Sequence, residues 1–279
     1  MSQTVLIWRN ENQKNTFTID NGKDFSGKHL KLGGDYRYIA DRALRNNIRL
    51  RSLVLGASME RVGEQSFYGC TSLHSVELGN VEKIRREAFK GCTKLKHICI
   101  PVETTYLGGG AFAECRWLDE VIFHEGSTCT TLRKEIFGQC IHLSRVKLPQ
   151  AVKFIDDYAF YRCKEITDIE FPYGLVHIGK EAFYQTGLTQ VNFPGTLETL
   201  GDSAFLKCNN LEFVHIPSSV KHMGKWVFHG CNRLKILEIT HDPETMGDWI
   251  INKSATIRCL KGSAVDNYCK RFEFKTEYI

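Results

Sequence analysis

The sequence predicts a curved α/β repeat solenoid of about nine coils, each made of a parallel strand and a short turn or helix. A phenylalanine recurs at intervals of 22, 23, 25, 23, 23, 22 and 23 residues, and Leu44 continues the series backwards. Other apolar positions keep fixed offsets from this aromatic. Such recurrence is typical of stacked repeats that cannot bury their apolar faces alone. The aromatic position is held by Phe67, Phe89, Phe112, Phe137, Phe160, Phe183, Phe205 and Phe228.

Residues 1–35 are expected to form an N-terminal cap. Leu30 and Leu32 precede Leu53 and Leu55 by 23 residues, which predicts a degenerate repeat strand before the first full copy. Residues 5–8 and 16–20 could pair as a hairpin through residues 10–15. Such a hairpin would cover the open end of the core, which both ends of a solenoid require.

Residues 36–240 are expected to form the repeat array. An aliphatic residue precedes each aromatic position by five, a leucine usually follows it by six, and branched or apolar residues follow by nine and eleven. The last part of each copy predicts a short strand, because branched and polar residues alternate there and proline often ends the run. Spacing near 23 residues is typical of leucine-rich repeats.

The eleven cysteines predict packing rather than disulfides or a metal site. Their number is odd, and neither a CxxC pair nor zinc-finger spacing occurs. We expect the thiols to be reduced and buried, since free cysteine behaves as a small hydrophobe. Seven of them follow the aromatic position by three residues: Cys70, Cys92, Cys115, Cys140, Cys163, Cys208 and Cys231.

Motifs of catalysis do not occur in the sequence. There is no nucleophile elbow, phosphate loop, dinucleotide fingerprint or HExxH motif. The glycines at 108–110 fit a tight turn, and His177 and His222 fit stacked surface positions rather than metal ligands. The sequence therefore predicts no enzyme, no cofactor and no metal. A catalytic part hidden in either terminal segment is disfavoured, because both segments are too short for an independent core.

The charge balance and hydropathy exclude two classes of partner. Lysine and arginine total 37 against 32 acidic residues, and residues 1–58 contain the whole excess. That excess is too small to predict nucleic-acid binding. No apolar run predicts a signal peptide or a membrane span. The sequence as it stands therefore predicts a cytoplasmic protein.

Two segments carry a family resemblance. Residues 67–78 (FYGCTSLHSVEL) and 204–217 (AFLKCNNLEFVHIP) resemble BspA-like leucine-rich repeats, and the similarity extends over residues 36–240. Residues 255–270 resemble that family's C-terminal cap, a last strand followed by a short helix, so we assign residues 241–279 to a cap. The resemblance implies a binding scaffold, often displayed on the surface of bacteria or protists. A cell-surface or secreted location is therefore the alternative to the cytoplasm.

The concave face of such a solenoid is its expected binding surface, and the outward positions of the strands would line it. Phe213 and Ile236 should present an apolar patch there, which tends to mark a contact. Arg145 and Lys147 should be partly neutralised by neighbouring acidic residues. The candidate partner-binding residues are Phe213, His215, Ile236, Glu238, Arg145, Lys147, Glu120, Asp168 and Glu170.

These observations predict a non-catalytic scaffold that recognises a protein partner through its concave sheet. The alternative is a structural or self-associating surface protein, in which apolar C-terminal strands or an exposed end of the solenoid would form a homodimer.

Overall fold

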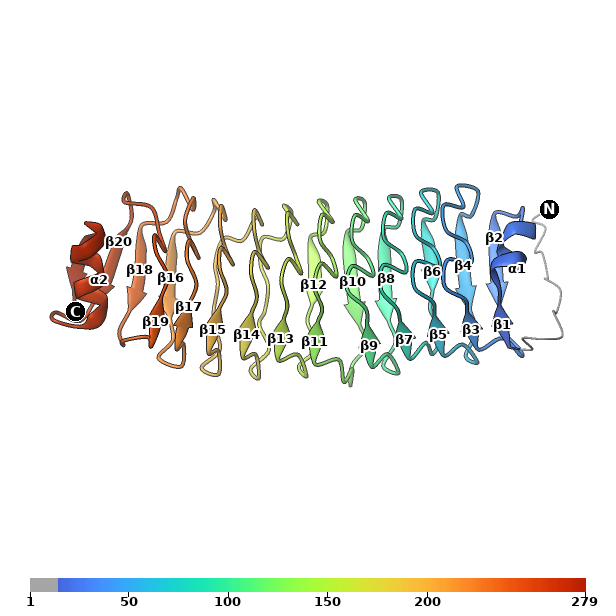
Figure 1. The fold of residues 1–279 in the computed structure, drawn as a ribbon, viewed down its shortest axis with the longest axis horizontal. Helices are drawn as coiled ribbons and strands as arrows, with labels where there is room; N and C mark the ends of the chain where they lie inside the picture. The colour runs from blue at the N-terminus through green and yellow to red at the C-terminus, as the bar shows by residue number, and fades with distance from the viewer. Residues whose placement is uncertain (1–14) are drawn as a thin grey trace. The chain divides into compact units, whose positions relative to one another are not determined.

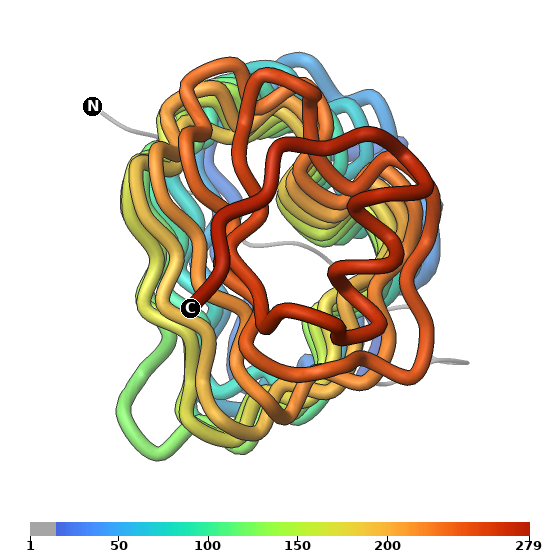
Figure 2. Tube along the Cα trace, turned by 90° about the vertical axis from the view of Figure 1, so that its left-hand side faces the viewer, coloured from blue at the N-terminus to red at the C-terminus, as the bar shows by residue number. Residues whose placement is uncertain are grey.

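The computed structural model describes residues 15–279 (Figure 1). The chain forms two compact units. Of the described residues, unit 1 contains those up to 129 and residues 135–149, and unit 2 contains residues 130–134 and 150–279. In each unit the chain winds as a solenoid of stacked parallel strands, as predicted, and Figure 2 shows that coils of the same unit follow similar paths. Residues 5–8 of the predicted hairpin lie outside the described residues.

Each unit contains two kinds of parallel sheet. The long-strand face has strands of three or four residues, and all of them except Lys275–Tyr278 were predicted from the sequence. In unit 1 they are β2 (His29–Leu32), β4 (Ser52–Leu55), β6 (Ser75–Glu77), β8 (His97–Ile100), β10 (Glu120–Phe123) and β12 (Arg145–Lys147). In unit 2 they are β16 (Phe213–Ile216), β18 (Ile236–Ile239), β20 (Thr256–Cys259) and β21 (Lys275–Tyr278).

The short-strand face was not foreseen as a sheet. Its two-residue strands between residues 38 and 223 contain the aliphatic residue that precedes the aromatic position by five, and this residue is buried. In unit 1 they are β1 (Thr16–Phe17), β3 (Tyr38–Ile39), β5 (Arg61–Val62), β7 (Lys83–Ile84) and β9 (Tyr106–Leu107). In unit 2 they are β11 (Thr131–Leu132), β13 (Phe154–Ile155), β14 (His177–Ile178), β15 (Thr199–Leu200), β17 (His222–Met223) and β19 (Thr245–Met246).

The N-terminal cap differs from the predicted hairpin in its described half. Thr16 and Phe17 form β1, which pairs in parallel with β3. The chain then forms helix α1 (Ile19–Asp24), because Thr18 caps the first turn and its hydroxyl accepts a hydrogen bond from the Asn21 N–H.

The phenylalanines form the core, as predicted. Their rings are fully buried and stack from coil to coil within each unit. The ring centroids of Phe67 and Phe89 are 5.1 Å apart, and the two ring planes make an angle of 4°. For Phe183 and Phe205 the centroids are also 5.1 Å apart, and the angle between the planes is 5°. Each ring therefore fills the space between its neighbours, which close packing of a repeat requires.

The segment around each phenylalanine, which we call the arc, is not a helix but forms backbone hydrogen bonds to the same segment of the next coil. The Gln65, Phe67 and Gly69 amides donate to carbonyls of the next coil at 2.8 to 3.0 Å. The residues two places before and two places after the aromatic generally have positive φ, as in Gln139 at 62°. This left-handed conformation costs about 1–2 kcal/mol for a residue other than glycine. We infer that the inter-coil hydrogen bonds offset this strain.

The periodic cysteines are buried, as predicted, and each is a free cysteine in the structure. In six coils the thiol also donates a hydrogen bond to a backbone carbonyl of the preceding coil, as Cys92 Sγ does to Phe67 O at 3.3 Å. Burial raises the pKa of Cys115 and of Cys208 to about 12. The cysteine thus satisfies a buried carbonyl that alanine would leave without this partner.

The long-strand face of unit 2 lacks strands at residues 167–171 and 189–193, where the alternation predicted them. The second of these coils is one residue shorter between the aromatic position and the following leucine. Gly187 spans the shortened turn, and a Cβ there would lie 2.4 Å from Lys164 O. The shortened turn shifts the start of residues 189–193 relative to residues 167–171. The backbone hydrogen bonds between these two segments therefore do not form a complete strand ladder.

The C-terminal cap contains one strand more than predicted. After β20 and helix α2 (Ala264–Phe272), the chain returns as β21, which pairs in parallel with β20. Asp266 ties the cap together, because its carboxylate accepts hydrogen bonds from Gly262 N at 2.8 Å, Lys270 Nζ at 2.9 Å and Tyr278 Oη at 3.1 Å. The same hydrogen bonds lower the pKa of Asp266.

Candidate functional site

The long-strand sheet at the C-terminal end of unit 2 places two rows of side chains on its outer surface. Val214, Leu237 and Ile257 alternate with these rows and are fully buried, so the rows face outward. We call the eight residues the C-terminal face. Strand register aligns the first row as Phe213, Ile236, Thr256 and Lys275, and the second row as His215, Glu238, Arg258 and Glu277.

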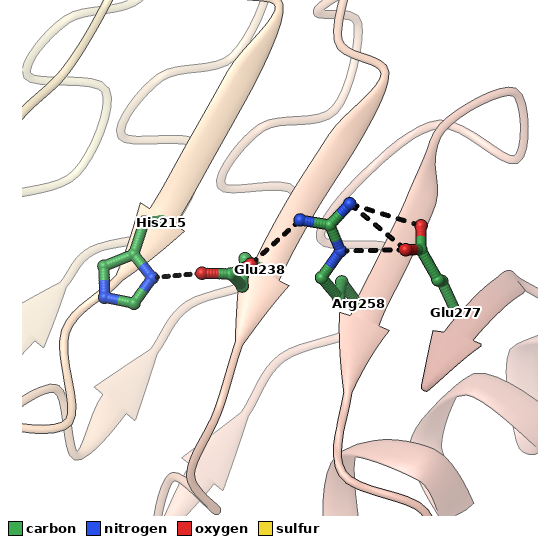
Figure 3. Close-up of polar contacts among 4 residues, drawn as sticks. All are labelled: His215, Glu238, Arg258 and Glu277. Atoms are coloured by element: carbon green, nitrogen blue, oxygen red, sulfur yellow. Dashed lines mark hydrogen bonds and ion pairs between the residues drawn. The ribbon is translucent and has the colours of Figure 1, made fainter. Parts of the chain in front are cut away.

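The second row is a continuous polar ladder (Figure 3). His215 Nδ1 lies 2.9 Å from Glu238 Oε1, and Arg258 Nη1 donates to Glu238 Oε2 at 3.1 Å. The Arg258 guanidinium also donates from Nε to Glu277 Oε1 at 3.2 Å and from Nη2 to Glu277 Oε2 at 3.4 Å. Each strand of the sheet therefore contributes one member to a chain of contacts.

These contacts offset part of the charge in the ladder, which has two carboxylates and one guanidinium. The hydrogen bond from Arg258 is the main cause that lowers the pKa of Glu238, and the same bond raises the pKa of Arg258. Glu238 therefore stays ionised at neutral pH beside the guanidinium. Because Arg258 is held between two carboxylates, the main effect of the ladder is to fix the positions of its side chains rather than to create a strong local electrostatic field.

In β16 and β18, where the second row has His215 and Glu238, the first row has the apolar side chains Phe213 and Ile236. Phe213 is 47% exposed although its strand neighbours Val214 and Ile216 are buried. Ile236 lies beside it in register. An exposed aromatic next to an aliphatic side chain on a flat sheet is the kind of patch that tends to mark a contact surface.

A shallow pocket of about 500 Å³ adjoins this row at the start of the strands. Glu212 lies at its edge and accepts hydrogen bonds from Arg233 at 2.7 Å and from Lys235 at 2.9 Å. These cations lower the pKa of Glu212. Asn232, Leu234, Ser254 and Thr256 complete the lining.

The remaining predicted residues do not join this face. Glu120, Arg145 and Lys147 lie in unit 1, where Arg145 Nε contacts Glu120 Oε1 at 3.1 Å. Asp168 and Glu170 are exposed in unit 2, in a segment where the long strand is missing. The predicted neutralisation between these two groups would join different units and stays a prediction. The structure brings together Phe213, His215, Ile236 and Glu238.

The sequence analysis missed Arg258 and Glu277, which complete the ladder. The repeat pattern does not reach them, because Arg258 follows Glu238 by only 20 residues and Glu277 follows Arg258 by 19. The alternation in residues 256–259 was the available signal for Arg258. For β21 no repeat signal exists, since its charged residues alternate with a half-buried threonine and an exposed tyrosine.

Other classes of site were sought in the part of the chain that the structure describes. Among residues 15–279, no cluster of three or more histidine, cysteine or acidic side chains could hold a metal ion. In the same residues, no helix is both long enough and apolar enough to cross a bilayer.

Known proteins similar to this chain are bacterial leucine-rich repeat proteins. A leucine-rich repeat protein from Bacteroides ovatus is 28% identical, with a TM-score of 0.70 over 85% of this chain and 63% of that protein. The chain thus spans less than two thirds of that relative. The pneumococcal vaccine antigen PcpA is 20% identical, with a TM-score of 0.62 over 91% of this chain and 77% of PcpA, which shows the fold alone.

Among curated proteins, none matches this sequence. The family model for a BspA type leucine rich repeat region of 6 copies matches residues 23–144 and 130–258, which together make up most of the chain. The repeat, the stacked phenylalanines and this match agree with the resemblance found in the sequence. The chain belongs to the BspA-type leucine-rich repeat family.

Proposed function

We propose that this chain is a non-catalytic scaffold that binds a protein partner through the C-terminal face. The observation that supports the proposal is the half-exposed Phe213 beside Ile236, on a sheet whose side chains are fixed by the adjoining ladder. Aromatic side chains on a rigid surface lose little entropy on binding and often supply most of the binding energy at an interface. Because its charged side chains already pair with one another, the ladder would orient the partner by hydrogen bonds more than by net charge.

The test compares two folded variants. Phe213→Ala with Ile236→Ser removes the apolar row, and Phe154→Ala removes a similarly exposed ring, 41% exposed, from the short-strand face of the same unit. Proteins captured from native lysate and medium by the wild type but lost with the first variant would be candidates. For a purified candidate, we expect the first variant to weaken binding about 30-fold, equal to roughly 2 kcal/mol.

The control variant Phe154→Ala should bind such a candidate as the wild type does. Equal binding by all three proteins would refute the assignment of the C-terminal face. Circular dichroism must show that each variant keeps its fold.

Self-association is the second candidate, favoured by one observation. Among residues 15–279, β21 has a strand partner only on its β20 side, so one edge of the sheet is unpaired. An unpaired edge can pair with a second chain, although exposed Lys275 and Glu277 oppose this. Light scattering across protein concentration distinguishes a dimer from a monomeric binder.

The location carries two proposals. The reduced cysteines favour the cytoplasm, whereas the family resemblance favours the cell surface or secretion. Fractionation of the native cells, with detection in the medium, distinguishes them.

A further inference from the structure

Trp117 lies exposed on unit 1, away from any role in the core. Its side chain is 56% exposed, and its backbone amide donates to Thr93 O at 3.2 Å. The indole stacks on the His142 ring of the next coil, with 4.4 Å between centroids and 12° between planes. Other coils place polar residues such as Ser72 and Lys94 at the equivalent position. The fold therefore holds a large apolar ring in a fixed orientation at the surface, where stability does not require one.

Three basic side chains surround this position in the repeat. Lys94 is the equivalent residue on the preceding coil, Lys96 is equivalent to Asp119, and Arg116 is adjacent to Trp117. All three are exposed, and within residues 15–279 none of them forms an ion pair. Their charge is therefore available to an anionic partner.

Hydrogen-bonding groups lie next to the ring on the same two coils. Asp119 accepts from Ser144 Oγ at 2.5 Å and from Arg145 Nη2 at 2.9 Å, and Arg145 also contacts Glu120. Asp119 follows Trp117 by two residues, and the residue between them, Leu118, is buried. These contacts hold the carboxylates beside the indole in a fixed geometry, and both stay partly exposed.

We propose that this surface of unit 1 binds an acidic polysaccharide. The C–H groups of a pyranose carry partial positive charge and pack on the negative face of an indole. Hydroxyl groups can donate to Asp119 and Glu120, while sugar carboxylates meet Lys94, Lys96 and Arg116. A single-stranded nucleic acid fits less well, because its bases usually stack on several aromatic rings.

The experiment measures binding of the full chain to polygalacturonate, with dextran as a neutral polymer and oligo(dT) as a nucleic acid. We expect polygalacturonate to bind more tightly than either and to weaken with salt, since paired charges are screened. Trp117→Ala should lower its affinity at least about tenfold. The double variant Lys94→Gln with Arg116→Gln should also lower it and reduce the dependence on salt.

The matched control is Trp226→Ala, because Trp226 is 42% exposed but lies in unit 2. It should bind as the wild type does, and so should the variant of the C-terminal face, which separates this proposal from the proposed function. Failure to bind polygalacturonate at low salt, or unchanged binding by Trp117→Ala, would overturn the proposal. Equal or tighter binding of oligo(dT) would overturn it in favour of a nucleic-acid surface.

Discussion

Replacing Phe183 with alanine should strongly destabilise unit 2. The ring is fully buried and stacks on Phe160 at 5.2 Å and on Phe205 at 5.1 Å, and the edge of Phe171 meets it at 5.6 Å. Removing a buried phenylalanine costs about 3–5 kcal/mol. Because three aromatic contacts are lost together, each contributing roughly 0.5–1.5 kcal/mol, we expect a value near the upper limit, about 5 kcal/mol.

Denaturant unfolding followed by circular dichroism and by tryptophan fluorescence measures this loss. Coincidence of the two transitions is needed before a free energy is assigned, since long repeat arrays can unfold in parts. Phe183→Leu keeps most of the volume and should cost less than about 2 kcal/mol. The exposed control Phe154→Ala should change stability by no more than about 0.5 kcal/mol. A loss below about 1 kcal/mol for Phe183→Ala would show that the aromatic stack is not the core of the unit.

Three further predictions concern the reactivity of the cysteines, the positive φ of Gln139 and the carboxylate of Asp266. Cys99 is exposed and should react with iodoacetamide in the native protein. Burial raises the pKa of Cys115 and of Cys208 to about 12, so these two thiols should react only after denaturation. Fast labelling of either one in the native protein would contradict its packing. Gln139→Gly should raise the unfolding free energy by about 0.5–1 kcal/mol, because φ is 62° there, and a loss would show that the strain is absent. The pKa of Asp266 is lower in the folded protein than in the unfolded chain. The stabilisation from its carboxylate is therefore present above the unfolded pKa near 3.9 and is lost as the pH falls through the folded pKa. Asp266→Asn should make the unfolding free energy depend less on pH in this acid range, and an unchanged dependence would contradict this.

The coil could be predicted from the sequence because each layer of the core repeats the same side chains. Phenylalanine, leucine and cysteine at fixed offsets specify which residues point inward, and the structure buries Phe160, Cys163 and Ile166 accordingly. The short-strand face was harder to predict, because a two-residue strand is too short for alternation to be visible. The left-handed residues were also hidden, since Gln139 and Tyr158 are not residue types that favour positive φ.

The candidate site was predictable only where it follows the repeat. Phe213 and Glu238 occupy outward positions of regular strands, so alternation alone placed them on the surface. Arg258 and Glu277 follow shortened intervals in the cap, where helix α2 replaces the usual arc, and the repeat has no equivalent of β21. The partners of a charged side chain on a sheet depend on the neighbouring strand, which one repeat unit does not specify.

The polar ladder bears on how the C-terminal face could recognise a partner. Glu238 is held by His215 on one side and by Arg258 on the other, and Arg258 is held by Glu277. A partner that competes for Arg258 must break hydrogen bonds to both carboxylates, so a simple anion would gain little there. Phe213 and Ile236 lose only water when they are covered, and their burial contributes roughly 25 cal/mol for each Å² of apolar surface. Under the proposed function, the charged residues would therefore act mainly as a polar border beside an apolar contact, and the energy of binding should come from Phe213 and Ile236.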